Sequence, residues 1–163
     1  MLIRVARQAD LPAMTDIYNQ AIATKHSTGD IQPMRVEDRL AWFREHLPGK
    51  HPIFVSEVDG QVAGWCSLSA YRAGRAALRH TAEISYYIAF THHRRGIGTA
   101  LIEYALDACP ALGIQHLFAI VLEGNQASLR LLENMGFERW GYMPQVADFD
   151  GREVVHLYYG RHV

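Results

Sequence analysis

The chain has 163 residues, of which 49% are hydrophobic and 20% are charged, a balance typical of one globular domain with a sizeable core. Its formal net charge of −1 offers no excess positive field for collecting phosphates, which argues against nucleic acid as the main partner. The first twelve residues, MLIRVARQADLP, carry charges that interrupt the apolar core of a signal peptide, and no apolar run approaches the roughly 20 residues of a membrane span. We therefore expect a cytoplasmic protein with no membrane partner.

The first half of the chain predicts a strand, two helices and a hairpin. Asp10 followed by Pro12 is typical of a helix start, and the apolar residues that follow recur at helical spacing. Two runs rich in β-forming residues meet at Asp59-Gly60, a pair typical of hairpin turns. In chain order we expect a strand at 2–6, a helix from Asp10 to about 23, a loop at 24–33, a helix at about 35–47, a hairpin at 51–69, and a loop or short helical excursion at 71–80.

The second half predicts strands that alternate with helices. Pro110 is expected to end the helix that starts near Gly96, and Gly113 to open the route to the next strand. Asn125 is a helix N-cap by residue type, and Gly136 fits the position just past the end of the same short helix. The expected elements are a strand at 81–90, a helix to about 109, a continuous apolar strand at 114–122, a helix at 125–135, and strands at 137–147 and 153–160.

These elements describe one α/β (α+β) domain that covers residues 1–163. Their order, β-α-α-β-β-β-α-β-α-β-β, predicts a mixed central sheet with helices on its faces. The two cysteines, Cys66 and Cys109, have neither metal-site nor redox spacing, so we expect buried thiols rather than a disulfide.

The stretch HHRRGIGTALIEYALDA, residues 92–108, places positive charge and two glycines at the start of an amphipathic helix. The first turn of a helix has unpaired amide N–H groups and the positive end of the helix dipole, and glycine lets a ligand approach the backbone. The pattern therefore indicates a phosphate or other anion site, and the alternative is an ordinary loop-to-helix junction. The candidate residues are Arg94, Arg95, Gly96, Ile97, Gly98 and Thr99.

Two motifs together resemble the GNAT acetyltransferase superfamily. The acetyl-CoA site of that superfamily has the pattern [Gln/Arg]-x-x-Gly-x-[Gly/Ala] at a strand-to-helix turn, where this chain has HRRGIG at residues 93–98. The stretch NQASLRLLENMGF, residues 125–137, is similar to the superfamily's Asn-x-x-[Ser/Ala] helix that ends in Gly-Phe. Four further segments resemble the phosphinothricin acetyltransferase-like group, namely IYNQAIA (17–23), VEDRLAWF (36–43), RHTAEISYYI (79–88) and MPQVADFDGR (143–152).

The resemblance implies a GNAT fold, with a mixed sheet of about six to seven strands flanked by about four helices. It also implies transfer of an acetyl group from acetyl-CoA, without a metal, to the α-amine of a small amino acid such as phosphinothricin or methionine sulfoximine. Glu83 would be the general base. Tyr87, which lies on the same face of the strand, would contact the substrate, and Arg79 would bind the substrate carboxylate. The residues that would bind acetyl-CoA are Ile88, Ala89, Arg94, Arg95, Gly96, Ile97, Gly98, Thr99, Asn125 and Ser128.

Several of these assignments have a purely structural alternative. Glu83 could be a solvent-facing strand residue paired with Arg79, and Arg79 could be a surface arginine. Asn125 would act as an N-cap in either case, and Ser128 could be no more than a helix residue. The paired histidines at 92–93 point in different directions and have no carboxylate at helical spacing, so we expect loop histidines near a phosphate and no metal site.

The chain departs from the family pattern at three positions. His93 replaces the usual Gln or Arg, which phosphate binding by the backbone tolerates. Leu132 stands where many members have a tyrosine or histidine as general acid, so no proton donor for the departing thiolate is evident. Gly29 lies in a loop where related enzymes often place an aromatic residue against the substrate, which leaves the acceptor open. Two alternatives therefore remain, a protein N-terminal or lysine acetyltransferase and a non-catalytic acyl-CoA-binding module.

The C-terminal segment is unusually rich in large apolar side chains. Alternation along a strand sends about half of them away from the core, and an exposed apolar patch usually marks an interface. We therefore expect a homodimer with a contact in this region, as the resemblance also implies. The residues concerned are Phe137, Trp140, Tyr142, Met143, Phe149, Tyr158 and Tyr159.

Overall fold

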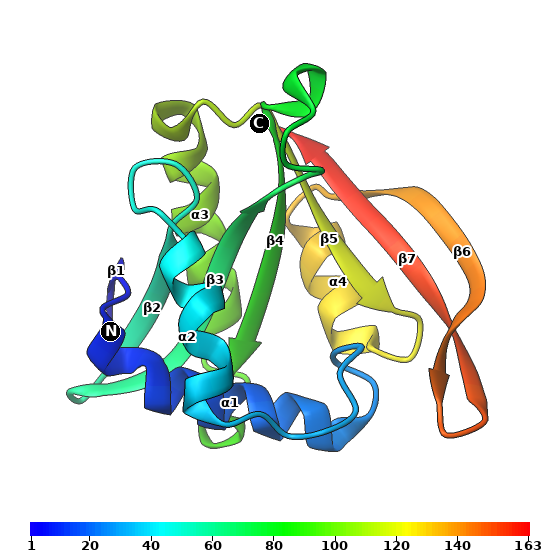
Figure 1. Cartoon of the computed structure of the whole chain (residues 1–163), viewed down its shortest axis with the longest axis horizontal. Coiled ribbons are helices and arrows are strands. Elements are labelled where there is room, and N and C mark those ends of the chain that lie inside the picture. The colour runs from blue at the N-terminus through cyan, green and yellow to red at the C-terminus, as the bar shows by residue number, and fades with distance from the viewer.

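Seven strands form one sheet in the order β1-β2-β3-β4-β5-β7-β6, in a computed structural model that describes residues 1–163 (Figure 1). Neighbouring strands are antiparallel except β4 and β5, which are parallel, so the predicted mixed sheet is confirmed. The strands are β1 (Leu2–Val5), β2 (Ile53–Val58), β3 (Gln61–Ala70), β4 (Thr81–Ile88), β5 (His116–Leu122), β6 (Glu138–Phe149) and β7 (Arg152–His162). The helices are α1 (Leu11–Thr24), α2 (Val36–Glu45), α3 (Ile97–Leu112) and α4 (Gln126–Asn134).

Helices cover both faces of the sheet (Figure 1). On one face, α1 and α2 enclose a small apolar core that includes Met14, Ile17 and Trp65. On the other face, α3 and α4 enclose a larger core that includes Leu101 and Leu132. Because successive side chains of a strand alternate between faces, β4 contributes to both cores.

The two parallel strands separate after three residue pairs. Their register joins Thr81–Glu83 of β4 with His116–Phe118 of β5, and no pair follows although both strands continue. Figure 1 shows the strands diverging toward the ends that lead into α3 and α4. The sheet is therefore open at its centre, next to the N-termini of two helices.

The prediction that Pro110 ends the third helix is wrong, because α3 continues to Leu112 with Pro110 inside it. Proline removes one amide donor, but the end of a helix is decided by its capping bonds. Gly113 has a left-handed φ of +71°, its amide bonds to the Pro110 carbonyl at 3.1 Å, and the Ile114 amide bonds to the Cys109 carbonyl at 3.0 Å. These two hydrogen bonds end the helix immediately before Gly113.

Asp10 occupies the predicted N-cap position of α1, but its carboxylate does not cap that helix. It accepts bonds from the Arg4 guanidinium at 2.7 and 2.9 Å and from the Arg7 amide at 2.7 Å. The side chain therefore stabilises a preceding 3₁₀ turn, η1 (Gln8–Asp10), and ties it to β1.

The remaining differences concern element ends. β4 stops two residues before the predicted end, and a 3₁₀ turn, η3 (Phe90–His92), leads from it toward α3. The segment at 71–80 contains a short helical turn, η2 (Ala76–Leu78), in agreement with the predicted excursion. Both cysteines are buried free thiols, as expected. None of the helices combines the length and apolar character that a bilayer span requires.

Candidate active site

The predicted anion site forms the first turn of α3. Gly96 occupies its N-cap with a φ of +76°, a left-handed conformation that glycine adopts without steric penalty. The first backbone hydrogen bond of the helix runs from the Ala100 amide to the Gly96 carbonyl at 3.0 Å. The amides of Ile97, Gly98 and Thr99 precede that bond and are therefore available to an anion.

A cavity of about 410 Å³ connects this turn with α4 across the central opening. We call it the glycine-side cavity. It brings together most of the residues predicted to bind acetyl-CoA, namely Ile88, Arg94, Gly96, Ile97, Gly98, Thr99, Asn125 and Ser128. Two predicted residues do not line it: Arg95 is exposed beside it, and Ala89 is buried with its amide bonded to the Ala63 carbonyl at 2.9 Å.

The far wall of the glycine-side cavity is the first turn of α4. The Asn125 side chain accepts a bond from the Ser128 amide at 3.2 Å, which confirms its predicted N-cap role. The Ser128 hydroxyl is hydrogen bonded to the Tyr86 hydroxyl, so one side-chain bridge spans the gap between β4 and α4. Sequence reasoning missed Tyr86, although a tyrosine between Ile84 and Ile88 on the apolar face of the strand was the signal.

Leu132 of α4 does not line the glycine-side cavity. It is fully buried in the core beneath α3 and α4. Leu132 is therefore apolar packing in this chain, and the proton-bearing side chains of β4 that line the glycine-side cavity are Tyr86 and Tyr87.

A second cavity, of about 340 Å³, lies on the α1 and α2 side of the sheet. We call it the aromatic cavity. Its walls come from α1, α2, β3, β4 and the loop after α1. The lining residues are Tyr18, Asp30, Met34, Asp38, Arg39, Trp42, Trp65, Ser67, Ser69, Glu83, Ser85 and Tyr87.

Glu83 faces the aromatic cavity together with Ser85 and Tyr87, as strand alternation predicted. Burial raises the pKa of the Glu83 carboxyl above its ordinary value, and the Ser85 hydroxyl, 3.5 Å away, partly offsets this effect. A carboxyl group with a raised pKa holds and releases protons closer to neutral pH than an exposed one does.

Arg79 lies away from both cavities. Its side chain is exposed, and its guanidinium donates to the Ala76 carbonyl at 3.0 Å. No ion pair joins it to Glu83. The arginine that the fold brings to Glu83's cavity is instead Arg39 of α2, which sequence reasoning missed. The signal was its place three residues after Val36 and four before Phe43, a spacing that puts the three side chains on one face of a helix.

Tyr87 connects the two cavities, because it lines both. Its ring packs on Tyr18 and Trp65 with centroid distances of 4.9 Å to each. Burial raises the pKa of the Tyr87 hydroxyl to about 12. Molecules held in the glycine-side cavity and in the aromatic cavity would therefore meet at this side chain.

Comparison with known proteins identifies this arrangement. The sequence model described as the Acetyltransferase (GNAT) family matches residues 13–137, which include the glycine turn, Glu83 and α4. The chain belongs to the GNAT acetyltransferase family. The predicted GNAT fold is therefore confirmed.

Relatives of this acetyltransferase span nearly its whole length. YwnH of Bacillus subtilis, whose name refers to phosphinothricin acetylation, is 40% identical over 153 residues, which are 93% of each chain. The L-methionine sulfoximine/L-methionine sulfone acetyltransferase of Salmonella typhimurium is 33% identical over 152 residues, 93% of this chain and 88% of that protein. A solved phosphinothricin acetyltransferase of Sinorhizobium meliloti, in complex with acetyl-CoA, has a TM-score of 0.92 at 28% identity and covers 99% of this chain and 88% of its own.

Acetyl-CoA is the cosubstrate of this GNAT acetyltransferase. The glycine-side cavity fits such a molecule, because free amides and Arg94 suit its phosphates at one end and the open sheet admits a linear chain. The chain contains no group of three or more His, Cys, Asp or Glu side chains arranged to hold a metal ion.

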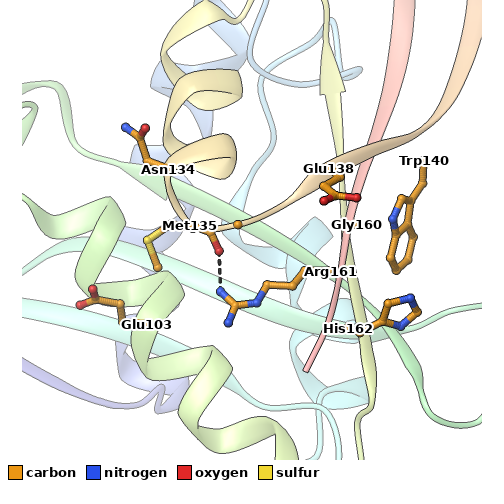
Figure 2. A pocket seen from close by; sticks show the side chains of 9 residues that line it. Glu103, Asn134, Met135, Glu138, Trp140, Gly160, Arg161 and His162 are labelled. Atoms are coloured by element: carbon orange, nitrogen blue, oxygen red, sulfur yellow. Dashed lines mark hydrogen bonds between the residues drawn. The ribbon is translucent and has the colours of Figure 1, made fainter.

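The acetyltransferase has a larger cavity, of about 650 Å³, at the opposite end of α4 (Figure 2). Its basic side chains are already engaged within the protein. Arg161 donates to the Met135 carbonyl, as Figure 2 shows, and the Nδ1 atom of His162 lies 2.8 Å from that of His116. Neither Glu83 nor the glycine turn lines this cavity, so we do not assign it to acetyl transfer.

Proposed function

We propose that this enzyme transfers the acetyl group of acetyl-CoA directly to the primary amine of a small amino-acid-like acceptor, of the phosphinothricin or methionine sulfoximine type. The observation that carries the proposal is the position of Glu83: a half-buried carboxyl group in an acceptor-sized cavity that meets the glycine-side cavity at Tyr87. A volume of about 340 Å³ lies within the range of small-molecule sites. The names of the relatives support the acceptor class.

The proposed cosubstrate contacts follow the glycine-side cavity. The phosphates bind the amides of residues 97–99, with Arg94 and Arg95 providing positive charge at the rim. The acyl-bearing arm passes Ile88 and Ala89 at the end of β4 and reaches Asn125 and Ser128 on α4. In this arrangement the thioester lies beside Tyr87.

Glu83 acts as the general base in this proposal. Its carboxylate removes a proton from the substrate ammonium, directly or through one water molecule. The free amine attacks the thioester carbonyl, a C–N bond forms, the C–S bond breaks, and CoA leaves as its thiolate. The nitrogen then loses its extra proton to give the neutral amide, and the thiolate takes up a proton to give CoA thiol. The two cavities contribute by holding amine and thioester within attack distance.

The substitution Glu83→Gln tests this role. The variant should fold and bind acetyl-CoA, while kcat for amino-acid acetylation falls by about 10²- to 10⁴-fold at neutral pH. The loss should shrink at high pH, where more of the amine is already neutral. Release of free thiol, measured with a panel of amino acids and peptides, gives the rates. Glu103→Gln, on the exposed side of α3, is the matched control.

The same panel separates the alternatives. Acetylation of peptide N-termini or lysine side chains in preference to free amino acids would indicate a protein acetyltransferase. Acetyl-CoA binding without thiol release from any amine would indicate a binding module. Full activity of Glu83→Gln at neutral pH would remove this residue from the mechanism.

We also propose that the enzyme is a homodimer that pairs through β6. This strand is the last in the sheet and exposes four large apolar side chains, Trp140, Tyr142, Met143 and Val146. Exposed apolar residues along a free strand edge favour an interface.

A further inference from the structure

Arg39 is a buried cation without an anionic partner. Only 6% of the residue is exposed, and the ion pairs of the chain join other arginines, Arg4 and Arg35, to carboxylates. Its Nε has no hydrogen-bond acceptor, and Nη1 reaches only the Met34 sulfur at 3.8 Å. Burial of a charge without a partner is unfavourable, so this arrangement needs an explanation.

Three aromatic rings hold the guanidinium in place. Its Cζ lies 4.3 Å from the ring centroid of Tyr18, 4.2 Å from that of Trp42 and 5.2 Å from that of Trp65. Cation–π contacts stabilise the charge and fix the orientation of the planar group. Aromatic faces accept no conventional hydrogen bonds, so the Nε donor of Arg39 stays unsatisfied and Nη1 has only the weak Met34 sulfur as acceptor.

The two carboxylates beside Arg39 in the aromatic cavity already have partners. Asp30 accepts a bond from the Tyr18 hydroxyl, and Asp38 is paired with Arg35 at 2.8 Å. The third carboxyl group of the cavity is Glu83, which is hydrogen bonded to Ser85. The wall around Arg39 therefore offers a fixed, positively charged group that pairs with no carboxylate of the protein and has an unsatisfied Nε donor.

We infer that Arg39 binds the carboxylate of the acceptor amino acid while the amine of the same molecule lies toward Glu83. This inference rests on the proposed function and assigns the carboxylate to α2 rather than to Arg79. A guanidinium and a carboxylate match as two parallel hydrogen bonds, which suits a pre-oriented planar group. The phosphates of acetyl-CoA do not compete for this group, because their site lies in the glycine-side cavity.

This assignment defines the substrate class more narrowly. A free amino acid carries both the amine and the carboxylate that the cavity recognises. A peptide N-terminus or a lysine side chain in a protein lacks a carboxylate at the matching distance. The enzyme should therefore discriminate an amino acid from its own carboxamide, although the less basic amine of the amide is chemically the easier one to acetylate.

The test compares methionine sulfone with methionine sulfone carboxamide as acceptors. With the wild-type enzyme, kcat/KM should favour the acid by about tenfold to a hundredfold. Arg39→Met, which keeps an apolar side chain between the rings, should abolish that preference by raising KM for the acid, with the amide little affected. Arg39→Lys keeps the charge without the planar group and should give an intermediate ratio. Arg44→Met, on the exposed side of α2, is the control.

A binding measurement keeps the inference independent of turnover. The acid, and not the amide, should raise the Tm of the wild-type protein, and Arg39→Met should lose this response while it remains folded. If the wild-type enzyme acetylates neither acceptor, the proposed function fails, but selective stabilisation by the acid would still support the carboxylate site. An unchanged acid preference in Arg39→Met, or its loss in Arg79→Met instead, would overturn the inference.

Discussion

At the scale of single residues, the proposed base has an energetic cost that pH should reveal. Burial raises the pKa of Glu83 above its ordinary 4.5, so the folded chain holds this proton more tightly than the unfolded chain. The contribution of Glu83 to stability therefore becomes less favourable as pH rises from about 4.5 through the folded pKa.

We predict that Glu83→Gln raises the Tm at pH values well above the folded pKa. The gain should shrink toward about pH 4, where both chains carry an uncharged group at this position. Scanning calorimetry across this pH range measures the difference, with Glu103→Gln as a control expected to show no such trend. A Tm gain that grows toward acid pH would contradict the prediction. A stabilised but inactive variant would fit the general trade-off between stability and function.

Sequence reasoning located the residues whose roles depend on near neighbours. Asn125 caps α4, Gly96 and Gly136 take left-handed conformations at helix ends, and Glu83 and Tyr87 share one face of β4. Arg39 and Tyr86 were missed because each meets its surroundings only in the folded chain. The partners of Arg39 come from α1 and β3 as well as its own helix, and that of Tyr86 lies 42 positions away in sequence.

At the scale of elements, α3 offers a matched pair of glycines. Gly96 begins the helix and Gly113 follows its last residue, with φ values of +76° and +71°, and a Cβ at either position would meet no protein atom within 4 Å. Alanine at either site should cost about 1–2 kcal/mol of folding free energy, because a left-handed conformation strains an L-residue.

Only the Gly96→Ala methyl group would stand at the anion site. We predict that this variant raises the Kd for acetyl-CoA by about tenfold, a loss of about 1.4 kcal/mol, while Gly113→Ala leaves it unchanged. Titration calorimetry on the two folded variants gives the comparison. Equal affinities would show that the glycine turn is a structural junction and no phosphate site.

Element prediction worked where the signal was local and failed where two signals competed. The Asp59-Gly60 turn, the hairpin and the continuous strand β5 all depend on short stretches of sequence. Pro110 is a residue typical of a helix end, but the capping bonds at Gly113 decide where α3 ends. The separation of β4 and β5 could not be predicted, because it concerns the register of strands that a whole helix separates in sequence.

At the scale of the whole molecule, the exposed edge of β6 leads to a prediction about mass. Trp140, Tyr142 and Met143 are 45%, 54% and 42% exposed on this strand. Light scattering at micromolar concentration should give twice the 18.4 kDa of the chain. Tyr142→Arg combined with Met143→Glu should shift the mass to the monomer by placing charge at the contact.

The control for this prediction is Leu47→Arg, since Leu47 is 59% exposed after α2, away from β6. That variant should remain dimeric. A monomeric wild-type protein would refute the proposed pairing outright.

The separation of β4 and β5 gives the sheet a third edge, in its middle. Outer edges can pair with strands of other molecules, and proteins limit the resulting aggregation by shortening, charging or covering them. The inner edge is protected by restricted access, because it faces a cavity of about 410 Å³ between two helix N-termini. The unpaired backbone groups of this edge are therefore next to the site proposed for acetyl-CoA, whose arm carries amide groups. In the proposed complex the cosubstrate takes the place of a neighbouring strand, so the edge that a sheet normally has to protect becomes part of its binding site.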